Sequence, residues 1–155
     1  MPYKFHAEPN AILVNRFGKR FTSEYKFTFG EALDERDEHG YPKHLPVWLI
    51  TDGDFFKQSP LLRWFARYDK RWVTQSNSIE DLADRIRLPA ANLKETVDRF
   101  NTFARNGKDE DFQRGESPLE RQRAPIAGIM RPITKAPFYA IPFNRSILGT
   151  KGGAR

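Results

Sequence analysis

The glycine-dense end of the sequence is the stretch whose residue types point most directly to a functional turn. Gly149, Gly152 and Gly153 all lie in the last ten residues, "SILGTKGGAR". They follow an apolar, strand-like run, "APFYAIPF". Glycine lets the backbone adopt conformations that other residues avoid, so a strand that runs into three glycines is typical of a working turn. A flexible end without function is the alternative interpretation.

Other residues that often do chemistry are scattered along the chain. His6, His39 and His44 are too far apart for a metal site, and we expect surface histidines, the last two in a polar loop. The acidic run at residues 109–111 has a spacing that matches no calcium loop. The sequence contains no G-x-S-x-G, P-loop or G-x-G-x-x-G motif and no cysteine. We therefore expect no metal site, and the lack of cysteine excludes disulfides.

The composition predicts one folded domain over residues 1–155. Hydrophobic residues make up 39% of the chain, and thirteen Phe, five Tyr and three Trp supply the bulk of a core, which excludes global disorder. No apolar stretch is long enough to span a membrane, and no secretory signal is present, so a cytoplasmic location is expected. The net charge of +6 is spread among 20 acids, which favours a solvated surface over nucleic-acid binding.

The first half of the chain predicts short strands and one helix. "AILVNRFGKRFTSEY" (residues 11–25) indicates two strands around a turn at Gly18, and residues 46–52 indicate a buried strand. The polar residues 33–44 between them are expected to form an exposed loop. Residues 54–72 predict a helix in their second half, with Pro60 in its first turn. Its aromatic and apolar stripe, expected to pack in the core, consists of Leu61, Trp64, Phe65 and Tyr68.

The second half predicts a pair of short helices broken at Leu88-Pro89. Ser78 is a good N-cap with an acid three residues later, and Asn106-Gly107 offers a C-cap. The inward-facing positions are Ile79, Leu82 and Ile86 in the first helix and Leu93, Val97, Phe100 and either Phe103 or Ala104 in the second. Residues 108–128 are expected to form an ordinary loop. Because strands and helices fall in separate blocks, the pattern predicts an α+β fold with a small mixed or antiparallel sheet and a helical pair.

Three segments together resemble one family of flavoproteins. "AILVNRFGKRFTSE" is similar to its block I-L-V-N-x-x-G-x-R-F-x-x-E. Residues 93–115 resemble its helix T-V-x-x-[FY]-N followed by a loop G-x-D-x-D-F-x-R-G, and "APFYAIPFNRSILGTKGG" resembles its segment P-F-Y-A…G-T-x-G-G. The family includes 3-ketosteroid dehydrogenases and the flavoprotein subunits of fumarate reductase and succinate dehydrogenase. The segments follow the family's order.

The resemblance implies that the chain is the substrate-side, or cap, domain of a larger FAD-dependent oxidoreductase, whose dinucleotide-binding domain is absent from this chain. In such flavoproteins the G-T-x-G-G turn lies beside the flavin ring and the substrate. This implies flavin contacts for Thr150, Gly152 and Gly153. The implied partners are the FAD-binding domain of the same enzyme and a small hydrophobic carbonyl compound. The chain is not expected to be active alone.

The implied reaction adds or removes hydrogens across a C–C bond next to a carbonyl. One carbon gives a hydride to the flavin, and a neighbouring carbon loses a proton. The resemblance implies that the Tyr139 hydroxyl and the Gly149 amide stabilise the oxyanion, with Arg145 as an alternative donor. The other interpretation of Tyr139 is a strand tyrosine with its ring in the core.

Two departures separate the chain from fumarate reductases. Thr28 stands where those enzymes carry an Arg proton donor, four residues after Glu24, and Gly149 stands where they place a His. Gly149 is similar to the ketosteroid dehydrogenases, although Tyr25 comes too early to match the tyrosine that they carry after the first block. Two alternatives stay open: a stand-alone basic binding module without catalysis, and a non-catalytic interaction domain that keeps the flavoenzyme shape.

Overall fold

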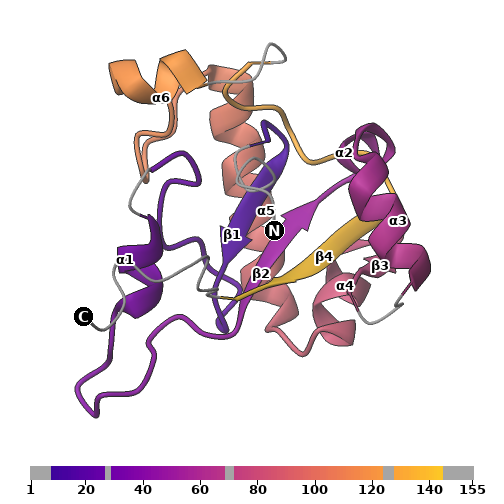
Figure 1. Cartoon of the computed structure of the whole chain (residues 1–155), viewed down its shortest axis with the longest axis horizontal. Helices are drawn as coiled ribbons and strands as arrows, with labels where there is room; N and C mark the ends of the chain where they lie inside the picture. Colours follow the sequence, from indigo (N-terminus) through magenta and orange to yellow (C-terminus); the bar gives the residue numbers. More distant parts are fainter. Residues whose placement is uncertain (1–7, 27–28, 69–71, 124–127, 145–155) are drawn as a thin grey trace, which may run out of the picture.

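The chain folds around one small sheet with helices on both of its faces (Figure 1). The computed structural model describes residues 8–26, 29–68, 72–123 and 128–144. In chain order the elements are β1 (Ala11–Val14), α1 (Phe29–Asp34), β2 (Val47–Thr51), α2 (Gly53–Gln58), α3 (Pro60–Tyr68), β3 (Thr74–Ser76), α4 (Ile79–Arg85), α5 (Ala90–Asn106), α6 (Pro118–Arg123) and β4 (Phe138–Phe143).

All neighbouring strands of the sheet run antiparallel, in the order β1-β2-β4-β3. At one end of the sheet Ala11 lies opposite Thr51, and Thr51 lies opposite Tyr139. Aliphatic and β-branched residues dominate β1 and β2, and both strands bury nearly all of their side chains. The buried strand expected at residues 46–52 is confirmed. An antiparallel sheet with adjoining helices also agrees with the α+β pattern.

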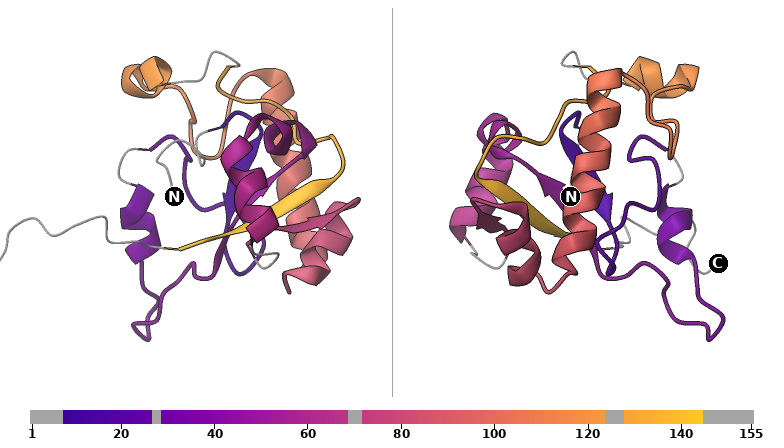
Figure 2. Two further views of the ribbon diagram at one scale, coloured as in Figure 1. Left: turned by 45° about the vertical axis from the view of Figure 1, so that its right-hand side comes forward. Right: turned by 180° about the vertical axis from the view of Figure 1, so that it is seen from behind.

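Alternate residues of the strands pack into two separate apolar clusters, one on each face of the sheet. On one face, Ile12 and Ala140 contact apolar side chains of α4 and α5. On the other face, Leu13 and Ile141 contact Phe55 of α2. Figure 2 shows α5 crossing one side of the sheet. The helices α2 and α3 lie beside one another at one end of the sheet. The period of two along a strand therefore decides which core each residue enters.

The expected helical pair is present. Ser78 caps α4, because its Oγ accepts a hydrogen bond of 3.2 Å from the backbone N–H of Asp81. The Asp81 carboxylate bonds Ser76 and Arg85, so it does not complete the capping box. Gly107 ends α5 in the left-handed region, at a φ of 73°. The inward-facing residues expected in both helices are buried, but α5 has 17 residues, so the second helix is not short.

The first turn differs from the expected strand–turn–strand. Gly18 has a φ of 71°, as a permissive turn residue should. After it, Arg20 forms an isolated bridge with Val14, and residues 21–25 form no strand. The physical reason is that the Glu24 side chain accepts a hydrogen bond of 3.0 Å from the backbone N–H of Leu13, which draws this segment against β1 by a side chain instead of a ladder.

The polar segment at residues 33–44 is exposed in its middle but not at its end. His39 is exposed, as expected, whereas His44 is 7% exposed, so its prediction as a surface histidine is wrong. The His44 ring stacks on Phe21, with ring centroids 4.4 Å apart, and its Nε2 lies 3.2 Å from the Glu35 carboxylate. Aromatic stacking and a carboxylate partner together explain why this imidazole can be buried.

Helix α3 corrects the core role expected for the aromatic stripe. Pro60 begins the helix, as its fixed φ allows. Trp64 and Tyr68 are 52% and 77% exposed, so their assignment to the core is wrong. The side chains of Leu61 and Phe65 lie outside the described part of the structure. Helical spacing shows which residues share a face, but not whether that face points inward.

Candidate functional site

Tyr139 is the one predicted site residue that falls within the described part of the chain. It is the second residue of β4, opposite Thr51 on one side and Gln75 on the other. Its side chain is 6% exposed, and its ring stacks on Phe56 of α2, with centroids 4.2 Å apart and planes 10° from parallel. Burial raises the pKa of its hydroxyl, so the group is a neutral hydrogen-bond donor. The ring is held as a core tyrosine, while the hydroxyl keeps its capacity to donate.

The remaining predicted site residues lie outside the described residues: Arg145, Gly149, Thr150, Gly152 and Gly153. Strand β4 nevertheless shows in which direction the chain runs toward them. Tyr139 is near its beginning and Phe143 is its last residue, about 13 Å further on at the usual rise of a strand. The strand therefore carries the backbone away from Tyr139 before Arg145 is reached.

Buried Asp52 fastens the end of the sheet at which Tyr139 lies. Its carboxylate accepts a hydrogen bond of 2.6 Å from Asn10 and one of 3.1 Å from the backbone N–H of Asp54, which caps α2. The other oxygen accepts from the backbone N–H groups of Thr134 (3.2 Å) and Lys135 (3.3 Å). One side chain thus joins the entry to β1, the start of α2 and the segment that leads into β4.

Gly53 lets the backbone of Lys135 and Ala136 approach the start of α2 closely. Its N–H donates a hydrogen bond of 2.9 Å to the Lys135 carbonyl. A Cβ at Gly53 would lie 3.2 Å from that oxygen and 3.3 Å from the Ala136 carbonyl oxygen, which is tighter than ordinary contact. The segment that leads to Tyr139 is therefore positioned by the Asp52 side chain and the Gly53 backbone.

A buried ionic network lies beside β1. Arg20 donates to Glu24 at 2.9 Å and to Asp109 at 2.8 Å, and Arg114 donates to Glu24 at 3.1 Å. No side chain of this network is more than 4% exposed. Two arginines and two carboxylates balance in charge, which is the condition for burying such groups. Residues 108–128 are thus not the ordinary loop that was expected, because they supply Asp109 and Arg114 and contain α6.

The charges of this network stay fixed near neutral pH. Burial alone would raise the carboxyl pKa values of Glu24 and Asp109, since it disfavours the charged form. The guanidinium groups of Arg20 and Arg114 around Glu24, and that of Arg20 at Asp109, outweigh burial and hold both pKa values below their usual range. Carboxylates that remain ionised and paired do not exchange protons, so this arrangement supports the fold instead of catalysing acid–base steps.

These four residues occupy positions of the motifs that carried the family resemblance. Arg20 and Glu24 are the charged residues of the R-F-x-x-E block, and Asp109 and Arg114 belong to the D-x-D-F-x-R-G loop. The sequence analysis did not connect the two motifs, because Arg20 and Asp109 are 89 positions apart in the chain. The sequence did contain one signal for this contact. The first motif has an Arg followed by a Glu, and the second has an Asp followed by an Arg, so each motif carries the charges that the other needs as partners.

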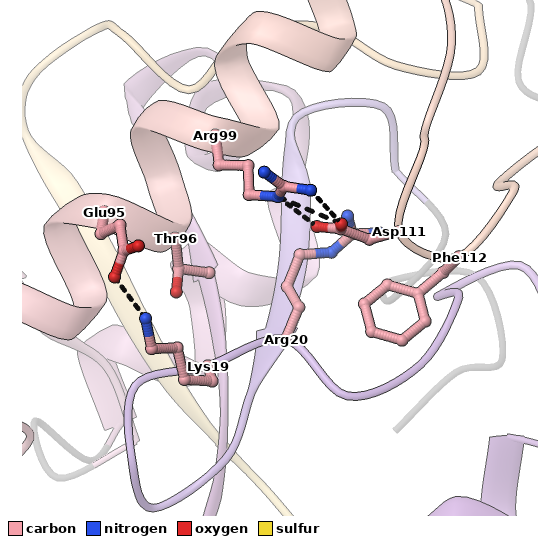
Figure 3. Close-up of a pocket in the computed structure, with 7 residues that line it drawn as sticks. All are labelled: Lys19, Arg20, Glu95, Thr96, Arg99, Asp111 and Phe112. Atoms are coloured by element: carbon pink, nitrogen blue, oxygen red, sulfur yellow. Dashed lines mark hydrogen bonds and ion pairs between the residues drawn. The ribbon is translucent and has the colours of Figure 1, made fainter.

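A surface pocket of about 410 Å³ borders this network (Figure 3). Its charged walls are paired with one another: Lys19 bonds Glu95, and Arg99 holds Asp111 through contacts of 2.6 to 3.1 Å. Figure 3 shows these pairs on either side of Thr96. Tyr139, the predicted site residue within the described ranges, does not line the pocket. Its charges are used within the fold, so it offers no argument for a substrate site.

The described ranges show neither a metal-binding cluster nor a membrane-spanning helix. Within them, no group of three or more His, Cys, Asp or Glu side chains is arranged around a metal-sized site. No helix in those ranges combines the length and the apolar character that crossing a membrane demands.

Comparison with known proteins gives the family. A family model described as an FAD binding domain matches residues 6–155. The chain belongs to the FAD binding domain family. Its flavoprotein relatives include the 3-oxosteroid 1-dehydrogenase of Mycobacterium tuberculosis, 34% identical over 95% of this chain. The chain spans 29% of the length of that relative.

Solved structures of related flavoproteins share the fold. The 3-ketosteroid Δ1-dehydrogenase of Sterolibacterium denitrificans, solved with 1,4-androstadiene-3,17-dione, is 28% identical with a TM-score of 0.74, covering 90% of this chain and 28% of that one. The open form of a flavocytochrome c3 fumarate reductase has a TM-score of 0.70 at 22% identity, covering 91% of this chain and 22% of that one. The second likeness shows the fold alone.

The described part of this FAD binding domain chain contains no cradle for a dinucleotide. Such cradles use a parallel sheet and a glycine-rich turn before a helix, whereas the sheet here is antiparallel and the sequence has no G-x-G-x-x-G. Thr150, Gly152 and Gly153, the residues expected at the flavin, lie outside the described residues. The association with FAD therefore rests on the family and not on the described geometry.

Proposed function

We propose that this chain is the substrate-side domain of an FAD-dependent oxidoreductase that adds or removes hydrogens across a C–C bond next to a carbonyl. The observation that carries the proposal is the 34% identity to a 3-oxosteroid 1-dehydrogenase over 95% of this chain. The likeness to a probable fumarate reductase of Shewanella frigidimarina is weaker in sequence, at 28% identity over 92% of this chain. Gly149, which replaces the His of fumarate reductases, supports a ring ketone as substrate over a dicarboxylate.

Within this proposal, the chain's own contribution is to stabilise charge on the substrate oxygen. Loss of a proton next to a carbonyl leaves negative charge on that oxygen, and positioned donors lower the barrier. The cofactor of the family supplies a sink for the electron pair. The backbone amide of Gly149 is the first proposed donor, and the second is the hydroxyl of Tyr139 or the guanidinium of Arg145.

The two candidates for the second donor make different demands on the backbone. Since Phe143 lies about 13 Å beyond Tyr139 along β4, Gly149 reaches the Tyr139 hydroxyl only if the chain reverses after Phe143. Six residues extend over at most about 20 Å, so such a reversal is long enough. Arg145 needs no reversal, because it comes two residues after the strand ends. The experiment must therefore compare both side chains.

The test is anaerobic reduction of the flavin by a 3-oxosteroid, in the flavoenzyme that carries this chain together with an FAD-bearing part. Gly149→Val should abolish reduction with flavin content unchanged, because a branched side chain would block the substrate. Tyr139→Phe should slow reduction about 10²-fold if its hydroxyl is the second donor, as for the loss of one oxyanion donor. The readout is the rate at which flavin absorbance is lost.

Gly30→Val is the matched control, since a Cβ at Gly30 meets nothing within 4 Å. It should reduce its flavin at the wild-type rate. A wild-type rate for Gly149→Val would contradict the turn as a wall of the active site. A wild-type rate for Tyr139→Phe alone would transfer the role of second donor to Arg145, whose Arg145→Gln variant should then be slow.

A further inference from the structure

The outer surface of α3 combines aromatic and basic side chains. Trp64 and Tyr68 lie one turn apart, both exposed, with ring centroids 4.6 Å apart. Arg63 and Arg67 are exposed beside them on the same helix. Trp72, shortly after the helix, is 45% exposed. We define the α3 face as Arg63, Trp64, Arg67 and Tyr68.

The charge around the α3 face is predominantly positive. Helix α3 contains no acidic residue. The neighbouring α2 adds Lys57, and the segment at residues 131–135 lies against α2 through the hydrogen bond from Gly53 to Lys135. Across α2, α3 and this segment the sequence has five cations and one acid, Asp54, which is paired with Lys135 and Arg131. Figures 1 and 2 both show α2 and α3 side by side at this end of the molecule.

Trp, Tyr and Arg in combination suit the boundary between water and a lipid bilayer. Trp and Tyr rings place an apolar body and a polar tip at headgroup depth, and Arg attracts anionic headgroups. A second copy of the chain would bring Arg63 and Arg67 against like charges, which disfavours a symmetric contact through this face. We propose that the α3 face docks on the surface of an anionic lipid bilayer.

Docking of this kind is peripheral. The rings of Trp64 and Tyr68 enter the headgroup layer, Arg63 and Arg67 contact lipid phosphates, and no helix of the described residues enters the hydrocarbon core. The inference does not depend on the proposed reaction, because it needs neither flavin nor turnover. Where both hold, docking would bring the substrate-side domain to the phase in which apolar ring ketones accumulate.

The first experiment uses the unmodified chain and vesicles of phosphatidylcholine with or without phosphatidylglycerol. We expect the chain to sediment with the phosphatidylglycerol vesicles, weakly or not at all with phosphatidylcholine alone, and less at high salt, since salt screens surface charges. Brominated lipids in the anionic vesicles should quench the tryptophan emission. Absence of anionic-lipid-dependent sedimentation, or of quenching, would overturn the proposal.

Variants then locate the surface. Arg63→Gln with Arg67→Gln should lower the partition coefficient about tenfold or more, because each basic residue near an anionic surface contributes substantially. Arg105→Gln with Lys108→Gln removes the same charge from the far end of α5, where both residues are exposed, and should leave binding unchanged. Equal losses in the two charge variants would indicate general basicity and overturn the proposal.

An aromatic pair of variants checks the rings. Trp64→Ala with Tyr68→Ala should weaken binding while the circular dichroism spectrum stays unchanged. Tyr41→Ala is the control, because it removes a ring that is 66% exposed in the loop between α1 and β2, and it should leave binding unchanged. Self-association that depends on Trp64, measured by sedimentation velocity without vesicle binding, would instead assign the face to a second copy of the chain and overturn the proposal.

Discussion

Glu24 is fully buried and binds three groups from different parts of the chain: the backbone N–H of Leu13 and the guanidinium groups of Arg20 and Arg114. Glu24→Gln keeps the shape of the side chain but removes its charge, which leaves two arginines facing one carboxylate. We expect the free energy of unfolding to fall by about 3–5 kcal/mol, as when one partner of a buried ion pair is removed. Urea denaturation measures the loss.

The same variant should also change the response to acid. The pKa of Glu24 is lowered in the folded state, so its contribution is complete above the unfolded-state value of about 4 and is lost as pH falls below it. The free energy of unfolding of the wild type should therefore decline through the acid range, and that of Glu24→Gln should decline less steeply. Parallel acid slopes would contradict the role assigned to Glu24.

Glu95→Gln is the matched control for this buried site. Glu95 pairs with Lys19 on the surface, with a side chain that is 68% exposed. Exposed ion pairs contribute roughly 1 kcal/mol or less, so its removal should be nearly neutral. A loss as large as that of Glu24→Gln would mean that the measurement reports general charge effects instead of the network.

At the scale of single residues, the sequence predicted backbone conformation better than it predicted which charged side chains bind one another. Gly18 and Gly107 were assigned to a turn and a helix end, and both have positive φ. Those assignments need only local information, because a left-handed backbone favours glycine wherever it occurs. The burial of Asp109 could not be read in this way, since it depends on Arg20, a residue distant in sequence. The acidic run was expected in an ordinary loop, because nothing within the run itself identifies its partner.

Helix α5 is the element that connects local pattern to the core most directly. Phe100 is 1% exposed on its inner face, within the cluster shared with α4 and the sheet. Phe100→Ala should lower the free energy of unfolding by about 3–5 kcal/mol, the cost of a large-to-small aromatic change in a packed core. Phe17→Ala provides the comparison, because Phe17 is 49% exposed, and it should cost far less. A loss below about 1 kcal/mol for Phe100→Ala would mean that Phe100 does not pack in the core.

Elements with local signals were predicted well, and elements defined by tertiary contacts were not. The strand β2 is a continuous apolar run bounded by Pro and Gly, and the helices α4 and α5 have apolar periods and end signals within their own sequence. Helix α3 has a clear period as well, yet Trp64 and Tyr68 face solvent, because a period gives no information about which side of the helix meets the core. The second strand expected after Gly18 failed for a similar reason, since Glu24 secures that segment to β1 by a side chain.

At the scale of the whole molecule, the described structure holds two apolar cores and no dinucleotide cradle. The chain belongs to a family named for FAD binding, yet it spans 29% of the length of its curated relative. Family membership and cofactor retention are therefore separate properties. The first depends on sequence and fold, while tight binding of a dinucleotide requires many contacts along the phosphates and the ring.

The isolated 155-residue chain should consequently fold but retain little FAD. The sheet buries side chains on both faces, so circular dichroism should show one cooperative thermal transition. Added FAD should shift the midpoint of that transition little, because a ligand stabilises a fold only in proportion to its affinity for the folded state. Absorbance after dialysis against buffer measures the flavin retained. A purified chain that keeps one yellow flavin per molecule would contradict this expectation. It would require the segment after Asn144, together with the described sheet, to form a complete flavin site.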